Sequence, residues 1–343
     1  MFIRSSRTTG MRFQPAVART VGIAGHSLGG GYGLLARLHG LTCDNLQQVT
    51  LIDAQATTLE ATATSEPDLF WACRGGGGGS FGIATQFVLR IFPLSEVLVF
   101  GVSWLLPQSK AARVFSAWQS WAPNAPSTIT CIMKLGPTAG SAISMRCIGQ
   151  SVGSRTELRN ELSALVNLEA PSKPLNIQTL SFLDAINHFS GGLNYESVYM
   201  KAKSDYVLSP LSPSAIAAML AAVAQVPVGG IAVLCDAYGG AIADLAAADT
   251  AFPRRAGTQY CIQYFSSWLH AADTPSRVAN LANVYTAMRP YLPGAAYVNY
   301  CDLDLQNFAD AYWGANLPRL SAVKKAYDPD NLFHHAQSVP VGP

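Results

Sequence analysis

The chain has 343 residues, of which 49% are hydrophobic and only 13% are charged, and its formal net charge is +2. This composition allows one large domain or two with a sizeable buried core, and it excludes an intrinsically disordered chain. The small net charge and the absence of any block of basic residues argue against nucleic acid or an anionic membrane surface as a partner.

The first prominent motif is TVGIAGHSLGGGYG, which runs from Thr20 to Gly33. It is preceded by MFIRSSRTTGMRF, which carries charges but no following apolar stretch and so lacks the pattern of a signal peptide. The segment GHSLG within the motif has the form of the nucleophile elbow of lipases and esterases. In that interpretation TVGIAG is the strand and GYGLLARLHG is the helix of the elbow.

The hydrolase hypothesis makes Ser27 a nucleophile. Its triad partners would be Asp302 or Asp328 and His334 or His335. Only about twenty-five residues precede the serine, whereas an α/β-hydrolase has several strands before its elbow. The extra glycines that follow would each destabilise the required helix by ~1 kcal/mol relative to alanine. The hydrolase is therefore kept as an alternative.

A second glycine cluster, Gly75 to Gly79, is followed by the run FGIATQFVLRIF. Apolar residues at odd positions in this run, such as Phe81, Ile83 and Phe87, have the period of a strand, and QQVTLIDA before the cluster is also strand-like. The letters Gly77 to Gly82 match G-x-G-x-x-G, but a dinucleotide site needs a helix after the glycines, so this match is accidental. Five consecutive glycines suit bare backbone N–H groups that face a ligand.

From about Pro93 to Pro293, helical and strand-like stretches alternate without a strict βαβ repeat. The predicted helices are 110–121, 155–166, 213–225 and 276–288, and the strand-like segments are STITCIMKLG, AISMRCIG, GIAVLCDAYGG and QYCIQYFSSW. This order predicts an α+β fold with an antiparallel sheet and helices packed on one side. The uncharged stretch 212–235 is interrupted by proline and glycines, so we expect a helix–turn–strand there and not a membrane span.

The tail begins with a helix at Pro318 that stops at Asp328, before a proline. The seven cysteines are scattered, with no C-x-x-C pair and no histidine spacing suited to zinc. We expect buried thiols and no metal site.

The end of the chain carries a resemblance to a known family through YVNYCDLDL (297–305) and YWGANLPRLSAVKKAYDPDNLFHHAQS (312–338). Further segments of the same kind are GHSLGGGYG, PDLFWACRGGGGGSFGIAT (67–85) and, in the middle of the chain, KAKSDYV and the segments of 236–268. Through these segments together the chain resembles the berberine-bridge-enzyme-like flavoproteins. These belong to the vanillyl-alcohol-oxidase class with PCMH-type FAD-binding domains. The resemblance covers Thr20 to about Ser338. It implies an FAD-dependent oxidase that removes a hydride from an alcohol or hemiacetal carbon of a carbohydrate or secondary metabolite, and passes electrons to O2 to give H2O2.

The resemblance also implies roles for individual residues. His26 would stabilise the reduced flavin near its N1–C2=O edge, and Tyr300 would take the proton of the substrate hydroxyl, which requires surroundings that lower its pKa. Gln263 would orient the substrate, Tyr32 would line the pocket, and Val21 would leave room for oxygen over the flavin. The residues expected to contact the cofactor are Val21, Gly25, His26, Gly29, Gly30, Gly31, Gly33, Gly78, Gly79, Phe81, Gly82, Ile83 and Asn331.

The chain departs from the family pattern in two respects. Ala18 stands where many relatives have the cysteine that bonds FAD, so we expect no cysteinyl link. The family's histidine attachment site and main pyrophosphate loop have no counterpart here, which implies an N-terminally truncated FAD domain, and a non-catalytic binding or structural remnant is a further alternative. We expect residues 1–92 to be the C-terminal half of the FAD-binding domain and 93–296 the substrate domain. Residues 297–343 would return to the FAD domain.

Overall fold

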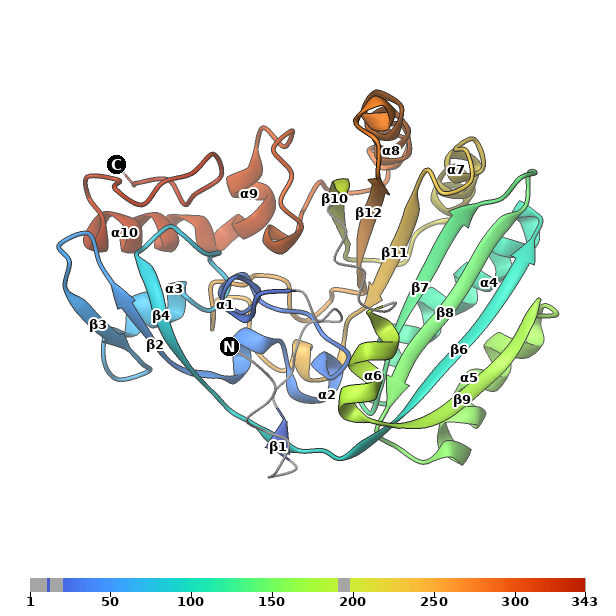
Figure 1. Ribbon diagram of the computed structural model, residues 1–343, viewed down its shortest axis with the longest axis horizontal. Helices are drawn as coiled ribbons and strands as arrows, with labels where there is room; N and C mark the ends of the chain where they lie inside the picture. Colours follow the sequence, from blue (N-terminus) through green and yellow to red (C-terminus); the bar gives the residue numbers. More distant parts are fainter. Residues whose placement is uncertain (1–10, 13–20, 191–197, 343) are drawn as a thin grey trace.

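The computed structural model describes residues 11–12, 21–190 and 198–342. A large antiparallel sheet forms one side of the molecule, at the right of Figure 1, and a small three-stranded sheet lies at the left. The large sheet has the strand order β10-β12-β11-β7-β8-β6-β9. Its strands are β6 (Glu96–Leu106), β7 (Ile129–Pro137), β8 (Ile143–Ser151), β9 (Lys173–Ser181), β10 (Tyr199–Val207), β11 (Ala232–Ala237) and β12 (Tyr260–Trp268).

Helices cover one face of the large sheet. They are α4 (Gln108–Trp121), α5 (Arg155–Leu168), α7 (Pro213–Ala224) and α8 (Thr274–Met288), and their apolar residues form one core with the sheet. Strand β7 shows how the sequence selects this face: Cys131, Met133 and Leu135 belong to that core, whereas Ile132 and Lys134 point the other way. The opposite face is partly covered by α6 (Phe182–Phe189), which packs on Val97 and Val99 of β6.

The small sheet has the order β3-β2-β4 and joins the beginning of the chain to its end. Its strands are β2 (Leu46–Ile52), β3 (Thr58–Ala61) and β4 (Ile83–Leu89). They share a core with α3 (Pro67–Ala72), α9 (Phe308–Trp313) and α10 (Leu317–Tyr327), so the C-terminal segment returns to the N-terminal part. Figure 1 shows α10 beside β2 and β4. A short pair, β1 (Met11–Arg12) and β5 (Phe92–Pro93), completes the sheets of the described residues.

Arg37 fastens the N-terminal part to the large sheet. It lies in the short helix α2 (Ala36–His39), is 1% exposed, and donates hydrogen bonds to the backbone carbonyls of Pro123, Ala125, Ile129 and Tyr238. A buried guanidinium is stable only where its donors are satisfied, and these carbonyls satisfy them.

The prediction of an α+β fold with helices on one side of an antiparallel sheet is confirmed. The stretch 212–235 forms α7, a turn and β11, as expected, because Ser212 caps the helix and Pro227 lies beyond its end. None of the helices in the part of the chain that the structure describes is long and apolar enough to span a bilayer. The strand expected at 81–92 begins at Ile83, and a bulge opposite Thr50 leaves Ile83 59% exposed.

Candidate functional site

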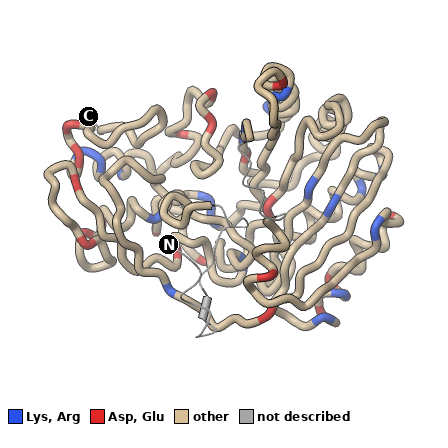
Figure 2. Tube along the Cα trace, in the orientation of Figure 1, with Lys and Arg blue, Asp and Glu red and all other residues tan. Residues whose placement is uncertain are grey.

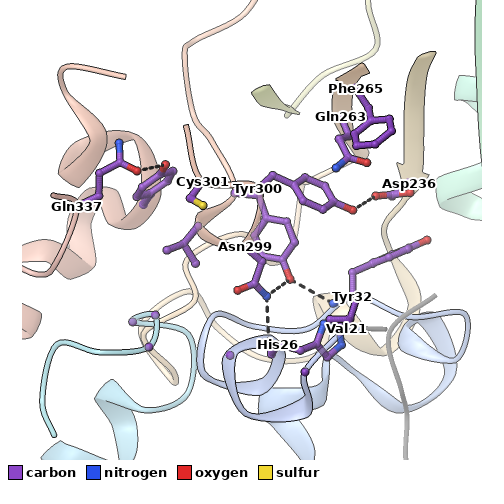
Figure 3. A pocket seen from close by; sticks show the side chains of 18 of the residues that line it. Val21, His26, Tyr32, Asp236, Gln263, Phe265, Asn299, Tyr300, Cys301 and Gln337 are labelled. Carbon is purple, nitrogen blue, oxygen red and sulfur yellow. Dashed lines mark hydrogen bonds between the residues drawn. The ribbon is translucent and has the colours of Figure 1, made fainter. Parts of the chain in front are cut away.

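A cavity of about 910 Å³ lies between the open face of the large sheet and the loops of the N- and C-terminal parts. The sheet contributes Ile132, Lys134, Met200, Leu234, Asp236, Gln263 and Phe265. The opposite wall consists of Val21, Gly22, Gly25, His26, Tyr32, Gly76, Gly77, Gly78 and Ser80. The C-terminal segment contributes residues 297–301 and 303, with Tyr312, Trp313, His335 and Gln337. Figure 3 shows these side chains around the cavity.

His26 lies on helix α1 (Ile23–Leu28) and is 8% exposed. Burial lowers the pKa of its imidazole to about 4, so the ring is neutral at pH 7. Its Nε2 has no hydrogen-bond partner among the described residues. A neutral imidazole with one unpaired nitrogen at a cavity wall can donate one hydrogen bond to a bound molecule or accept one from it, depending on its tautomer.

Tyr297 and Asn299 hold the loop that follows His26. The Tyr297 hydroxyl accepts hydrogen bonds from the N–H groups of Gly31, at 2.8 Å, and Tyr32, at 3.2 Å. Asn299 Nδ2 donates to the His26 carbonyl at 3.0 Å and to the Tyr297 hydroxyl at 2.9 Å. The C-terminal segment therefore fixes α1 and its loop from the cavity side.

The half-buried Tyr300 and the buried Asp236 form a hydrogen-bonded pair where the C-terminal segment meets the sheet. The Tyr300 hydroxyl donates to Asp236 Oδ2 at 3.0 Å, and Figure 3 shows the phenol pointing at this carboxyl group. Burial raises the pKa of Asp236 to about 6, although the Tyr300 hydrogen bond and the charge of Lys134 act in the opposite direction. Burial and then the charge of Asp236 raise the pKa of Tyr300 well above 10. The expectation that the surroundings lower the Tyr300 pKa is therefore wrong.

The cavity brings together all four residues expected to act on substrate: Tyr300, His26, Gln263 and Tyr32. The side chain of Gln263 makes no hydrogen bond within the described part of the chain, so its amide is available to a bound molecule. Tyr32 is engaged, since its hydroxyl donates to the Ala237 carbonyl at 3.1 Å. Of the residues expected to contact the cofactor, Val21, Gly25, His26 and Gly78 line the cavity.

The other expected cofactor residues do not line the cavity. A Cβ at Gly29 would lie 2.0 Å from Asn299 Oδ1, at Gly30 2.8 Å from Phe252, and at Gly31 2.6 Å from Thr42. These glycines therefore bring the loop close to protein side chains, and their contact with the cofactor stays a prediction. The remaining positions also lie outside the cavity wall: Gly33 accepts from Ala36 N, Gly79 lies beside His335, Phe81 is in the small-sheet core, Gly82 packs on Ile52, Ile83 is exposed, and Asn331 forms a turn with Asp328.

The hydrolase alternative is not supported, because GHSLG is helical. Residues Ile23–Leu28 form α1 where the elbow requires a strand and a tight turn. Ser27 is fully buried, and its Oγ has no partner in the described structure. The proposed triad acids are engaged elsewhere, Asp302 with Lys201 and Lys203 and Asp328 with Lys324.

Asp236, Asn299 and Lys134 line the cavity but were not expected from the sequence. Asp236 and Lys134 are each the only charged residue of their strand, β11 and β7 respectively. An isolated charge in an otherwise apolar strand is a usable signal for a functional side chain. Ala18, the position of the absent cysteine, lies outside the described residues.

The comparisons agree on one family. The model of the family described as "Berberine and berberine like" matches residues 296–340. The FAD-linked oxidoreductase YgaK of Bacillus subtilis is 32% identical over 96% of this chain and 73% of its own length, and berberine bridge enzyme-like 25 of Arabidopsis thaliana is 33% identical over 96% and 67%.

Two solved structures have the same fold. The structure of Physcomitrella patens BBE-like 1 superposes with a TM-score of 0.91 at 30% identity, covering 99% of this chain and 75% of that one. Berberine bridge enzyme from Eschscholzia californica gives a TM-score of 0.89 at 25% identity, covering 98% and 74%. The chain therefore belongs to the berberine bridge enzyme-like family of FAD-linked oxidoreductases.

Proposed function

We propose that this oxidoreductase binds FAD in the cavity and oxidises an alcohol or hemiacetal carbon of a small molecule. The walls suit a flat, polar cofactor. A Cβ added at Gly22 or Gly25 would meet no atom within 4 Å, so both leave open space at the cavity, and His26 Nε2 is an unpaired buried nitrogen at the same wall. Val21, Gly22, Gly25, His26 and the backbone of Gly76–Gly78 would hold the cofactor. FAD bound there would accept a hydride and transfer the electron pair to O2, giving H2O2.

The observation that carries this proposal is the Tyr300–Asp236 hydrogen bond inside the cavity. Tyr300 would accept the proton of the substrate hydroxyl and pass its own proton to Asp236, whose pKa of about 6 leaves it ionised at pH 7. The phenol then needs no independent ionisation, which agrees with its raised pKa. The pair titrates as a unit.

Three further residues have supporting roles in this proposal. Gln263 would hydrogen-bond the substrate, because its amide lies at the cavity with no partner in the described chain. His26 would donate to the cofactor edge as a neutral imidazole, because its pKa of about 4 excludes a positive charge at pH 7. Val21, at the cavity edge and 47% exposed, would leave a path for O2.

We also propose the division into FAD-binding parts at 1–92 and 297–343 and a substrate part at 93–296. The shared core of β2, β3, β4, α3, α9 and α10 supports it, and so does the separate core of the large sheet. The alternative of a non-catalytic module is not favoured, because Tyr300, Asp236, His26 and Gln263 converge on one cavity.

The test is cofactor binding followed by peroxide formation. The purified protein, incubated with FAD and separated by gel filtration, is expected to retain the visible absorption of flavin. Aerobic addition of alcohol and sugar substrates should then release H2O2, measured with a peroxidase-coupled dye. The Ser27→Ala variant serves as a control and should behave as the wild type. A protein that remains colourless after incubation would contradict the proposal, and flavin reduction without H2O2 would remove O2 as acceptor.

A further inference from the structure

Two cations stand side by side on the open face of the large sheet, Lys134 at the cavity and Arg146 exposed beside it. Lys134 of β7 lines the cavity, and its direct cross-strand partner on β8 is Arg146. Figure 2 marks the lysines and arginines of the large sheet in blue. We propose that Lys134 and Arg146 bind an anionic group of the substrate, a carboxylate, while the alcohol to be oxidised lies at Tyr300. This inference rests on the proposed function and specifies its substrate class.

The register places the pair in line with the substrate-facing residues. Gln263 pairs with Leu234, Leu234 with Lys134, and Lys134 with Arg146, so the four form one row across four strands. Residues of one row point to the same face of an antiparallel sheet. Three of them, Gln263, Leu234 and Lys134, line the cavity. The row therefore leads from the amide beside Tyr300 to the two cations.

The Arg146 side chain lies on this face as well. A Cβ added to Gly101 of β6 would be 4.0 Å from Arg146 Nη2 and 3.6 Å from Ile148 Cγ2. Ile148 pairs with Ile132, which lines the cavity. The guanidinium is thus directed over β6 beside the cavity-facing row that contains Ile132.

Neither cation has an acidic partner within the described residues. The acid on the same wall is Asp236, which stands diagonal to Lys134, makes no ion pair with it, and accepts the hydrogen bond of Tyr300. Three buried cations are, in contrast, paired with acids: Lys203 with Asp302, Arg255 with Asp44 and Lys324 with Asp328. Burial and then the charge of Arg146 lower the pKa of Lys134, and the charge of Asp236 acts in the opposite direction without forming an ion pair.

Like charges directly opposite each other on adjacent strands are destabilising, and an anion between them removes the repulsion. Carboxylates are held strongly by guanidinium and ammonium groups together, through charge-assisted hydrogen bonds. Diagonal neighbours such as Lys134 and Asp236 have Cα atoms about 7–8 Å apart. The acid and the alcohol therefore belong to one small molecule or to adjacent units of a short oligosaccharide.

The test uses matched pairs of disaccharides that differ only in a carboxylate or a hydroxymethyl group at C6 of one ring. Binding to the wild type, Lys134→Met, Arg146→Gln and the double variant is measured by calorimetry at two salt concentrations. Lys110→Met, on α4 at the other face of the sheet, is the matched control. We expect an acid to bind about 10- to 100-fold more tightly than its neutral partner in the wild type and the control, as for one charge-assisted contact. This difference in affinity between an acid and its neutral partner should shrink at high salt and vanish in the double variant.

The inference is overturned if no acid in the set binds more tightly than its neutral partner, or if the double variant keeps the preference. The outcome separates it from the proposed function, because calorimetry requires no turnover. Flavin reduction by neutral disaccharides as fast as by acids would leave the proposed function standing and remove the inference. If acids bind in a salt-dependent way that needs Lys134, but the flavin is never reduced, the inference stands and the proposed function is contradicted.

Discussion

Asp236 is the residue on which the chemistry of the Tyr300 pair depends. Its carboxyl must be ionised to receive a proton, and its pKa is raised by burial to about 6. We expect the rate of anaerobic flavin reduction by substrate to be constant above this pH and to fall about tenfold per unit below it, as protonation removes the acceptor. Stopped-flow rates between pH 4.5 and 8 measure the profile.

A matched variant gives the sign of this dependence. The charge of Lys134 lowers the Asp236 pKa, so Lys134→Met should move the fall in rate to higher pH. A profile that is flat through pH 6 in the wild type would show that Asp236 receives no proton in the reaction.

His26 tests the cofactor side of the cavity. As a neutral donor it would stabilise the charge that develops when the cofactor is reduced. His26→Ala should lower the two-electron flavin potential by about 30–60 mV, the equivalent of one hydrogen bond to a charged group. His26→Gln, which keeps a donor, should recover part of the difference in a dye-equilibration titration. Equal potentials in all three proteins would remove His26 from this role.

The resemblance to a known family was enough to predict that Tyr300, His26, Tyr32 and Gln263 lie in one site, and all four line the cavity. It could not supply Asp236, because the contact joins positions 64 residues apart and depends on the register of β11 in the sheet. Nor could it show that Gly29–Gly31 pack on Asn299, Phe252 and Thr42. Glycines that face a ligand and glycines that face protein look alike in a sequence.

At the scale of elements, strand β10 is linked to the segment that follows Tyr300. Lys203 Nζ lies 2.6 Å from Asp302 and 3.0 Å from Asp304, and Lys201 binds the same two carboxylates. Lys203 and Asp302 side chains are only 9% and 6% exposed. This cluster holds the segment next to Tyr300 against the sheet.

Lys203→Met should therefore destabilise the protein by about 1–3 kcal/mol, since a nearly buried carboxylate loses one of two partners. Arg319→Met provides the control, because its pair with Asp68 is exposed on both sides and should contribute about 1 kcal/mol or less. Urea unfolding measures both. Lys203→Met should also slow flavin reduction by substrate, and equal stability losses in the two variants would contradict a structural role for the cluster.

The elements with a clear hydrophobic period were predictable from the sequence. Helices α4, α5, α7, α8 and α10 were expected close to their observed bounds, as were β7, β8, β11 and β12. Strand β6 was not, because Val97 and Val99 pack under α6 while Phe100 and Val102 pack under the helices of the other face, so its apolar residues do not alternate. Helix α1 was not expected either, and only the hydrolase alternative assigned a strand to TVGIAG; Asn299 and Tyr297, far away in the sequence, hold the helix and its loop.

At the scale of the molecule, the site exists only where the N-terminal part, the C-terminal segment and the large sheet meet. Arg37 is a principal link of this junction, and its buried guanidinium donates to the carbonyls of Tyr238, Pro123 and Ala125. Arg37→Met should cost at least about 3 kcal/mol in the free energy of unfolding, because several buried carbonyls lose their partner together.

Arg155→Met is the matched control for this prediction, since Arg155 is exposed and donates to Ile177 and Thr179 at the sheet edge. Its loss should change stability by about 0.5 kcal/mol. Thermal and urea unfolding of the two variants, with FAD retention as a second readout, decides whether the junction depends on Arg37. Similar stabilities would show that it does not.

The measurement that tests the account most directly is the rate of anaerobic flavin reduction in Tyr300→Phe, compared with the wild type under identical substrate. If Tyr300 takes the substrate proton and passes its own to Asp236, the variant should retain FAD and be reduced about 100- to 10,000-fold more slowly. Reduction of the variant at the wild-type rate would contradict the account, because the phenol at the centre of the cavity would then have no part in the chemistry.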